Sequence, residues 1–118
     1  MAKRQHIINC FILSALALII RVGIVVYHDF DGLYGQDAFA YFNFAGDLLN
    51  FVSTRMPPPP FFWSIGYPLQ LAVAFKLLNI SPQTALTLSV GMGALLPVLV
   101  YVLSLQFNLR SPYAFLAG

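Results

Sequence analysis

The chain has 118 residues, of which 59% are hydrophobic and 8% are charged, and its mean hydropathy is +0.79. Soluble domains carry about 25% charged residues, so this composition predicts a protein that resides in the lipid bilayer. The net charge of +2 is too small and too scattered to predict nucleic-acid binding, and the single cysteine, Cys10, excludes an internal disulfide bond.

Residues 6–27 are predicted to form a first transmembrane helix. The segment follows Lys3 and Arg4, and only Arg21 interrupts its apolar run. About 20 residues at roughly 1.5 Å each span a bilayer core of about 30 Å. A signal peptide also has a basic start, but its apolar region is only roughly 7 to 15 residues long. A retained membrane helix is therefore favoured.

All the acidic residues fall in the following loop, residues 28–62, and they are Asp29, Asp31, Asp37 and Asp47. A carboxylate at mid-bilayer costs about 2.5–3.5 kcal/mol, so we expect this loop in water or at the membrane surface. Within the loop, apolar residues recur at helical spacing and predict an amphipathic interfacial helix over 36–51; they are Ala40, Phe44, Leu48 and Phe51. Asp37 and Tyr41, four residues apart, share another face of that helix.

The second half of the chain predicts two more spans. The proline run at 57–60 predicts a stiff extended spacer of about 12 Å, and a short second span follows over 63–78. Ser81 and Pro82 are typical of a helix start, and the helix they begin is expected to cross the membrane over 84–107. The final residues, "YAFLAG", resemble the opening of a fourth span.

The orientation follows from the basic residues near the ends of these spans. Lys3 and Arg4 favour a cytoplasmic N-terminus, which places loop 28–62 on the external face. With three spans, Lys76 is then expected inside, whereas Arg55 and Arg110 are expected outside. The predicted location is the plasma or inner membrane of a prokaryote, with the lipid bilayer itself as one partner.

Asp37 suggests chemistry at this external surface. An acid held beside aromatic residues and between two spans suits a substrate with a lipid tail and a polar head. Asp37 can then act as a general base that takes a proton from an attacking acceptor hydroxyl. The alternative is a solvated aspartate in the first turn of a helix, where it complements the helix dipole. The residues alone leave both interpretations open.

Several motifs in a fixed order carry a family resemblance. They are a basic N-terminus, a span with Arg21 in its outer half, the loop "YGQDAFAYFNFAGDLL", a proline-rich stretch, "GYPLQLAVAF" and "NISPQTALTLSVGMGALLPVLVYVLSLQF". The series resembles the N-terminal part of the polytopic C-type glycosyltransferases. The branch it is most similar to is the bacterial and archaeal one, akin to dolichyl-phosphate-mannose-protein mannosyltransferases and aminoarabinose transferases.

The resemblance extends to particular residues. The family pattern of an acid followed by a tyrosine and small residues is matched by Asp37, Ala38, Tyr41 and Ala45. Its Gly-Tyr-Pro element is matched by residues 66–68, although the prolines that usually precede it lie earlier, at 57–60. The resemblance implies inverting transfer of a sugar from a polyprenyl-phosphate donor to an acceptor on the external face. It also implies that Asp37 is the catalytic base and that Tyr41 lies in the substrate site.

Other charged residues have two interpretations each. Asp29 and Asp31 form a D-x-D pair, a spacing that binds a divalent metal in some relatives, and the alternative is a pair of solvated loop acids. Arg21 either snorkels to the surface or meets a donor phosphate or a loop aspartate inside a cavity. Arg55 either binds a phosphate or lies among lipid headgroups.

The resemblance also implies that three spans are fewer than the family's shared core. The chain is therefore expected to be an N-terminal part of such an enzyme that is inactive alone. The alternative function is a non-catalytic small membrane protein, an accessory subunit or part of a transporter. The sugar and the acceptor are not specified by these residues.

Overall fold

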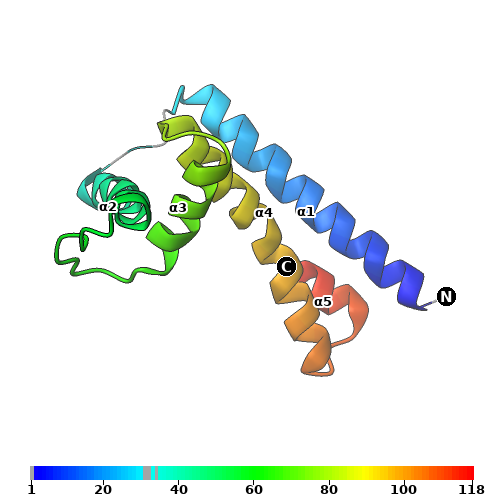
Figure 1. Ribbon diagram of the computed structural model, residues 1–118. Coiled ribbons are helices and arrows are strands. Elements are labelled where there is room, and N and C mark those ends of the chain that lie inside the picture. Colours follow the sequence, from blue (N-terminus) through cyan, green and yellow to red (C-terminus); the bar gives the residue numbers. More distant parts are fainter. Residues whose placement is uncertain (1, 31–32, 34) are drawn as a thin grey trace. The chain divides into compact units, whose positions relative to one another are not determined.

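The computed structural model describes residues 2–30, 33 and 35–118, and within them the fold is helical (Figure 1). The helices are α1 (Ala2–Tyr27), α2 (Gly35–Thr54), α3 (Gly66–Leu77), α4 (Pro82–Gln106) and α5 (Ser111–Ala117). The all-α class predicted from the sequence is confirmed. The chain divides into two compact units, which are described separately: unit 1 contains 1–29 and 89–118, and unit 2 contains 30–88.

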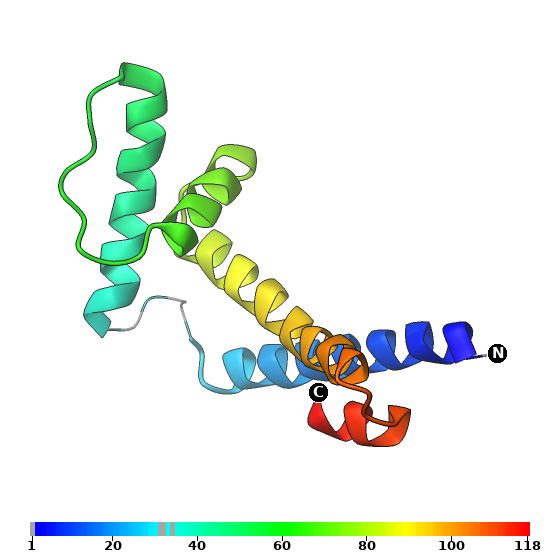
Figure 2. The ribbon, with the colours of Figure 1, turned by 90° about the horizontal axis from the view of Figure 1, so that it is seen from below.

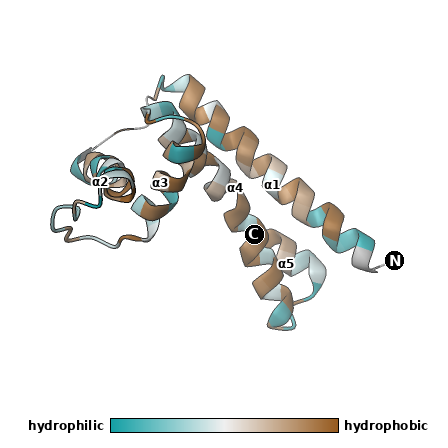
Figure 3. Cartoon of the chain, viewed as in Figure 1, coloured by the Kyte–Doolittle hydropathy of each residue, from teal (hydrophilic) through white to brown (hydrophobic). Residues whose placement is uncertain are grey.

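Among the residues that the structure describes, two helices are long and apolar enough to cross a membrane. One runs from Arg4 to Tyr27 and the other is α4, and both are predominantly hydrophobic along their length (Figure 3). Their apolar side chains are largely uncovered: Phe11 is 75% exposed and Leu99 is 57% exposed. A helix in the core of a soluble protein buries such side chains, so lipid is the environment that suits these surfaces.

The expected three-span count is not confirmed. The segment expected to be the second span forms α3, which has only 12 residues. At 1.5 Å per residue α3 is about 18 Å long, whereas a bilayer core is about 30 Å thick. The side of α3 that is buried, formed by Pro68, Leu71, Ala72 and Phe75, packs within unit 2.

In unit 1, α1 and the C-terminal part of α4 run antiparallel. Near the start of α1, His6 contacts Tyr101, and farther along α1 Arg21 lies against Gly93. Because a later residue of α1 meets an earlier residue of α4, the two helices point in opposite directions. Their shared core contains Leu13, Tyr101 and Ala114, so the short helix α5 completes the packing. The "YAFLAG" segment thus forms part of this seven-residue helix.

In unit 2, α2 packs against α3 and the first turns of α4. The core residues are Ala45, Leu71, Ala72, Phe75 and Ala85, and the rings of Phe42 and Phe75 meet edge to face with centroids 5.0 Å apart. Small alanines let the helices approach closely while the two phenylalanines fill the remaining space. The start of α4 is capped as expected, because the hydroxyl of Ser81 accepts a hydrogen bond of 3.2 Å from the Thr84 amide.

Helix α2 confirms the helix predicted over 36–51 and extends it to Gly35–Thr54. Its expected apolar face is buried only in part, because Phe44 is 6% exposed and Phe51 is 42% exposed. Ala45, which is fully buried, lies outside the expected stripe. The helix buries a second side because α3 and the loop after α2 both pack on it.

Candidate functional site

Asp37 lies in the first turn of α2 and is exposed. The backbone reaches this turn through Gly35, which has a φ of 78°, a left-handed conformation that glycine adopts without strain. At this position the carboxylate complements the positive end of the helix dipole. It is also free to meet a molecule that approaches the surface of unit 2.

Tyr41, one turn after Asp37, is the centre of an aromatic cluster. Its ring centroid lies 6.0 Å from that of Phe61, 6.4 Å from that of Trp63 and 5.7 Å from that of Tyr67. All three pairs meet edge to face, the arrangement that aromatic quadrupoles favour. Residues at i and i+4 of a helix have Cβ atoms about 5–6 Å apart, so the side chain of Asp37 leaves α2 next to that of Tyr41.

The proline spacer explains how the cluster forms. After α2 ends at Thr54, the chain turns back at Arg55, which has a φ of 58°, and the extended run 57–60 returns along the helix. Four prolines in this conformation cover about 12 Å, which is close to the roughly 15 Å that separates Thr54 from Phe44 along α2. Phe61 therefore reaches Phe44 and stacks on it, with ring centroids 3.9 Å apart and planes 7° from parallel. Figure 2 shows this loop beside α2.

The sequence pattern did not predict this cluster. Phe61, Phe62 and Trp63 fit an aromatic belt at the membrane boundary, and nothing in their spacing indicates that Phe61 stacks on α2. The useful signal was the proline run, whose stiffness fixes how far the chain returns. Together, the exposed Asp37 and the rings around Tyr41 offer one acid or base next to aromatic side chains.

Arg55 is not brought close to Asp37. It follows the last residue of α2, and 18 residues of nearly continuous helix separate it from Asp37, a distance of about 27 Å at 1.5 Å per residue. Its side chain is exposed. The structure therefore places Asp37 and Arg55 at opposite ends of the same helix.

Arg21 lies on α1 in unit 1. Its side chain is half-buried and lies against α4. Its guanidinium lies so close to Gly93 that a Cβ atom at that position would collide with Nε. Pro97 lacks an N–H group, so the carbonyl of Gly93 has no helical donor. Arg21 also borders a cavity of about 290 Å³, whose other lining residues are Leu13, Leu16, Ala17, Ile20, Pro97 and Gly118.

The structure describes only half of the predicted metal pair. Asp29 lies in the turn after α1 with a φ of 50° and is exposed, and Asp31 lies outside the described residues. Within the described part of the chain, no three His, Cys, Asp or Glu side chains gather closely enough to hold a metal ion. The Asp29–Asp31 metal site stays a prediction.

A second polar cluster, which the sequence reasoning missed, lies inside unit 1. The fully buried Tyr101 hydroxyl lies 2.7 Å from His6 Nδ1 and accepts a 3.0 Å hydrogen bond from the Asn9 amide. Asn9 also donates to Ser111 Oγ at 3.4 Å and accepts from Gln5 at 3.0 Å. The signal was present in the sequence, because Gln5, His6 and Asn9 are polar residues in the first turns of an otherwise apolar helix.

Comparisons with protein-family models, with curated proteins and with solved structures found no match to this chain.

Proposed function

We propose that this protein is part of a membrane glycosyltransferase that moves a sugar from a polyprenyl-phosphate donor to an acceptor at the external membrane face. The observation that carries the proposal is the pairing of Asp37 with the aromatic cluster around Tyr41. Asp37, Tyr41 and Tyr67 are also among the residues on which the resemblance to polytopic C-type glycosyltransferases depends. Aromatic rings can pack against the C–H faces of a sugar. An exposed carboxylate next to them can deprotonate a hydroxyl group.

In the proposed reaction Asp37 is the general base. It accepts the proton of the acceptor hydroxyl while that oxygen attacks the anomeric carbon of the donor sugar. The new bond joins the acceptor oxygen to this carbon as the bond from the carbon to the phosphate oxygen breaks. The polyprenyl phosphate leaves with the bonding electrons from the opposite face, so the configuration inverts. Asp37 then returns its proton to water, to which it is exposed.

The packing of unit 1 supports an external position for this site. Helices α1 and α4 are antiparallel, so with a cytoplasmic N-terminus α1 leads out and α4 leads back in. All of 28–81 then lies on the external side, which includes α2 and α3. A third complete crossing by α3 would make α1 and α4 parallel. We therefore propose two crossings, with α3 at the external surface beside α2.

The charge distribution is compatible with either number of crossings. Two crossings place Lys3, Arg4 and Arg110 inside, whereas three crossings place Lys3, Arg4 and Lys76 inside. Each arrangement leaves two other basic loop residues outside, so the positive-inside rule does not choose between them. The antiparallel pairing of α1 with α4 is the observation that favours two crossings.

The other charged residues singled out in the sequence are assigned roles around the proposed reaction. Arg21 is the candidate ligand of the donor phosphate, because a half-buried arginine beside a cavity in a membrane helix is typical of a functional site. Arg55, at the far end of α2, is assigned to lipid headgroups. Asp29 and Asp31 are the candidate ligands of a divalent metal.

The test is the substitution Asp37→Asn in membranes that contain the protein, with transfer of a radiolabelled sugar from its polyprenyl phosphate as the readout. General-base catalysis contributes about 10²–10⁴-fold, so we expect a loss of at least about 100-fold. The matched control is Asp47→Asn on the same helix, for which we expect near-normal transfer. Unchanged turnover in Asp37→Asn membranes would contradict the proposal and favour the alternative, a non-catalytic accessory or transporter component.

A further inference from the structure

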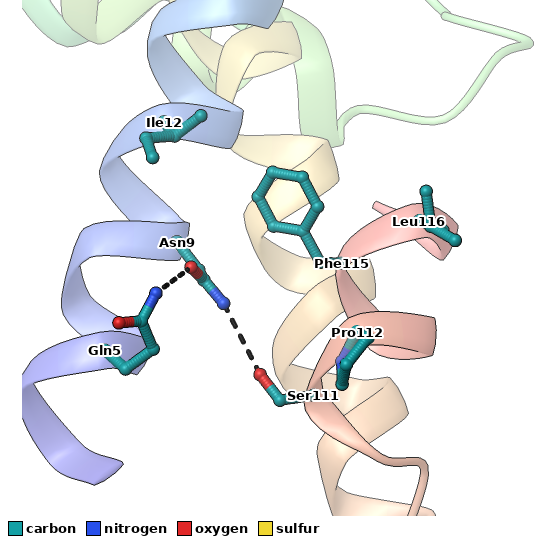
Figure 4. Close-up of a pocket in the computed structure, with 7 residues that line it drawn as sticks. All are labelled: Gln5, Asn9, Ile12, Ser111, Pro112, Phe115 and Leu116. Carbon is teal, nitrogen blue, oxygen red and sulfur yellow. Dashed lines mark hydrogen bonds between the residues drawn. The ribbon is translucent and has the colours of Figure 1, made fainter. Parts of the chain in front are cut away.

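A groove of about 480 Å³ lies in unit 1 between the start of α1 and α5 (Figure 4). Its lining residues are Gln5, Asn9, Ile12, Ser111, Pro112, Phe115 and Leu116. Neither Asp37, the proposed base, nor Arg21, the candidate phosphate ligand, lines this groove.

The groove has a polar end and an apolar end. Gln5 and Ser111 lie at one end, and Ile12, Phe115 and Leu116 lie farther along it (Figure 4). The polar end is at the start of α1, near the membrane surface, whereas Ile12 lies about 10 Å deeper at 1.5 Å per residue. A ligand that fits this gradient has a hydrogen-bonding head at the membrane surface and a hydrocarbon tail in the bilayer.

The buried polar cluster holds the polar end in place. Asn9 is only 9% exposed, and its amide nitrogen donates to both Tyr101 and Ser111. When His6 donates to the Tyr101 hydroxyl and this hydroxyl donates to Ser111 Oγ, 3.3 Å away, the Ser111 proton is available to an oxygen atom of a ligand. The side chains at this end are therefore oriented before a ligand arrives, which lowers the entropy cost of binding.

The charge around the polar end favours an anionic head. Arg4 directly precedes Gln5 and Arg110 directly precedes Ser111, and both arginines are exposed. The nearest side-chain carboxylate of unit 1 along α1 is Asp29, 24 residues after Gln5 and about 36 Å away at 1.5 Å per residue. Basic pockets between membrane helices on the cytoplasmic side bind the headgroups of anionic lipids.

We infer that this groove binds an anionic phospholipid of the cytoplasmic leaflet. The phosphate lies between Arg4 and Arg110, with Ser111 as a hydrogen-bond donor, and an acyl chain lies along Ile12 and Phe115. This assignment rests on the proposed membrane insertion of α1 and α4 with a cytoplasmic N-terminus and is independent of sugar transfer.

The test uses the purified protein in a mild detergent, with phosphatidylglycerol and phosphatidylcholine of the same acyl chains as probes and native mass spectrometry as the readout. We expect preferential retention of phosphatidylglycerol. The double substitution R4Q/R110Q should reduce that preference by about 30-fold, which corresponds to about 1 kcal/mol for each arginine. The control is K76Q, which removes an exposed cation of unit 2 and should keep the preference.

A second variant tests the apolar end. Leu116 is 81% exposed, so Leu116→Trp should fold normally while its indole fills the groove and reduces the retention of both lipids. Equal retention of the two lipids by the unmodified protein, or equal losses in R4Q/R110Q and K76Q, would overturn the inference. Displacement of phosphatidylglycerol by excess inorganic phosphate alone would also overturn it, because the tail would then contribute nothing.

Discussion

The Nδ1 atom of His6 lies 2.7 Å from the hydroxyl of Tyr101, although 95 residues separate the two along the chain. This contact joins α1 to α4 within the buried polar cluster of unit 1. Asn9 donates to the same hydroxyl, so one oxygen atom of α4 contacts two polar side chains of α1. A buried donor without a partner is costly, and Tyr101 removes that cost for Asn9.

The substitution Tyr101→Phe should therefore destabilise the pairing of α1 with α4. It removes the nearer acceptor of the Asn9 amide and leaves only the longer bond to Ser111, and interhelical hydrogen bonds in membranes contribute about 0.6 to 1.7 kcal/mol. We expect the free energy of unfolding in detergent to fall by about 1 kcal/mol, measured by circular dichroism during titration with a denaturing detergent. Tyr113→Phe is the control, because Tyr113 is 62% exposed. Equal stability of the two variants would refute a structural role for this hydroxyl.

A second prediction concerns the close approach of Arg21 to Gly93. A Cβ atom at Gly93 would collide with the guanidinium, whereas one at Gly91 meets nothing within 4 Å. Alanine is favoured over glycine inside a helix, so Gly91→Ala should stabilise the protein by about 0.5 kcal/mol. Gly93→Ala must displace the arginine and should be less stable than Gly91→Ala by about 1 kcal/mol.

A double-mutant cycle separates this collision from other effects of Gly93. When Arg21 is replaced by alanine, the two glycine substitutions should have the same effect on the free energy of unfolding. A difference that persists without the arginine would mean that something other than the guanidinium limits the space at Gly93.

The membrane-type helices could be predicted from the sequence because their signals are local. The spans expected over 6–27 and 84–107 correspond to Ala2–Tyr27 and Pro82–Gln106. An apolar run that only Arg21 interrupts predicts the first helix, and the Ser81–Pro82 pair predicts the start of the second. No long-range information is required for either.

The expected second span and the aromatic cluster show where local signals were insufficient. The apolar composition of α3 is as compatible with packing on α2 as with crossing a bilayer, and only its length of 12 residues distinguishes the two. The contacts of Tyr41 depend on where the chain returns after Pro60. The pairing of His6 with Tyr101 likewise joins segments that no sequence period relates.

A third prediction tests the aromatic cluster. Phe61 stacks on Phe44 and contacts Tyr41 and Trp63, so Phe61→Ala should destabilise unit 2 by about 2 kcal/mol, less than a fully buried phenylalanine would. It should also reduce the near-ultraviolet circular dichroism signal of the aromatic side chains. Phe62→Ala is the matched control, because Phe62 is 92% exposed. If both variants had the same stability, the stacking would have no energetic importance.

A fourth prediction distinguishes two membrane crossings from three. In a Cys10→Ser background, a cysteine at Lys76 should react with a membrane-impermeant maleimide applied from outside intact cells. A cysteine at Arg110 should react only after the membrane is permeabilised. Three crossings give the opposite result for both positions, so a reversed labelling pattern would refute the two-crossing arrangement.

The position of Trp63 has a practical consequence. It is the only tryptophan of the chain, and its indole meets the ring of Tyr41 at a centroid distance of 6.4 Å, one helical turn from Asp37. Indole emission depends on the polarity around the ring, so a glycolipid head that displaces water from this surface should shift the fluorescence toward blue wavelengths. Occupancy of the site can thus be followed in real time by an intrinsic fluorophore, without any attached dye.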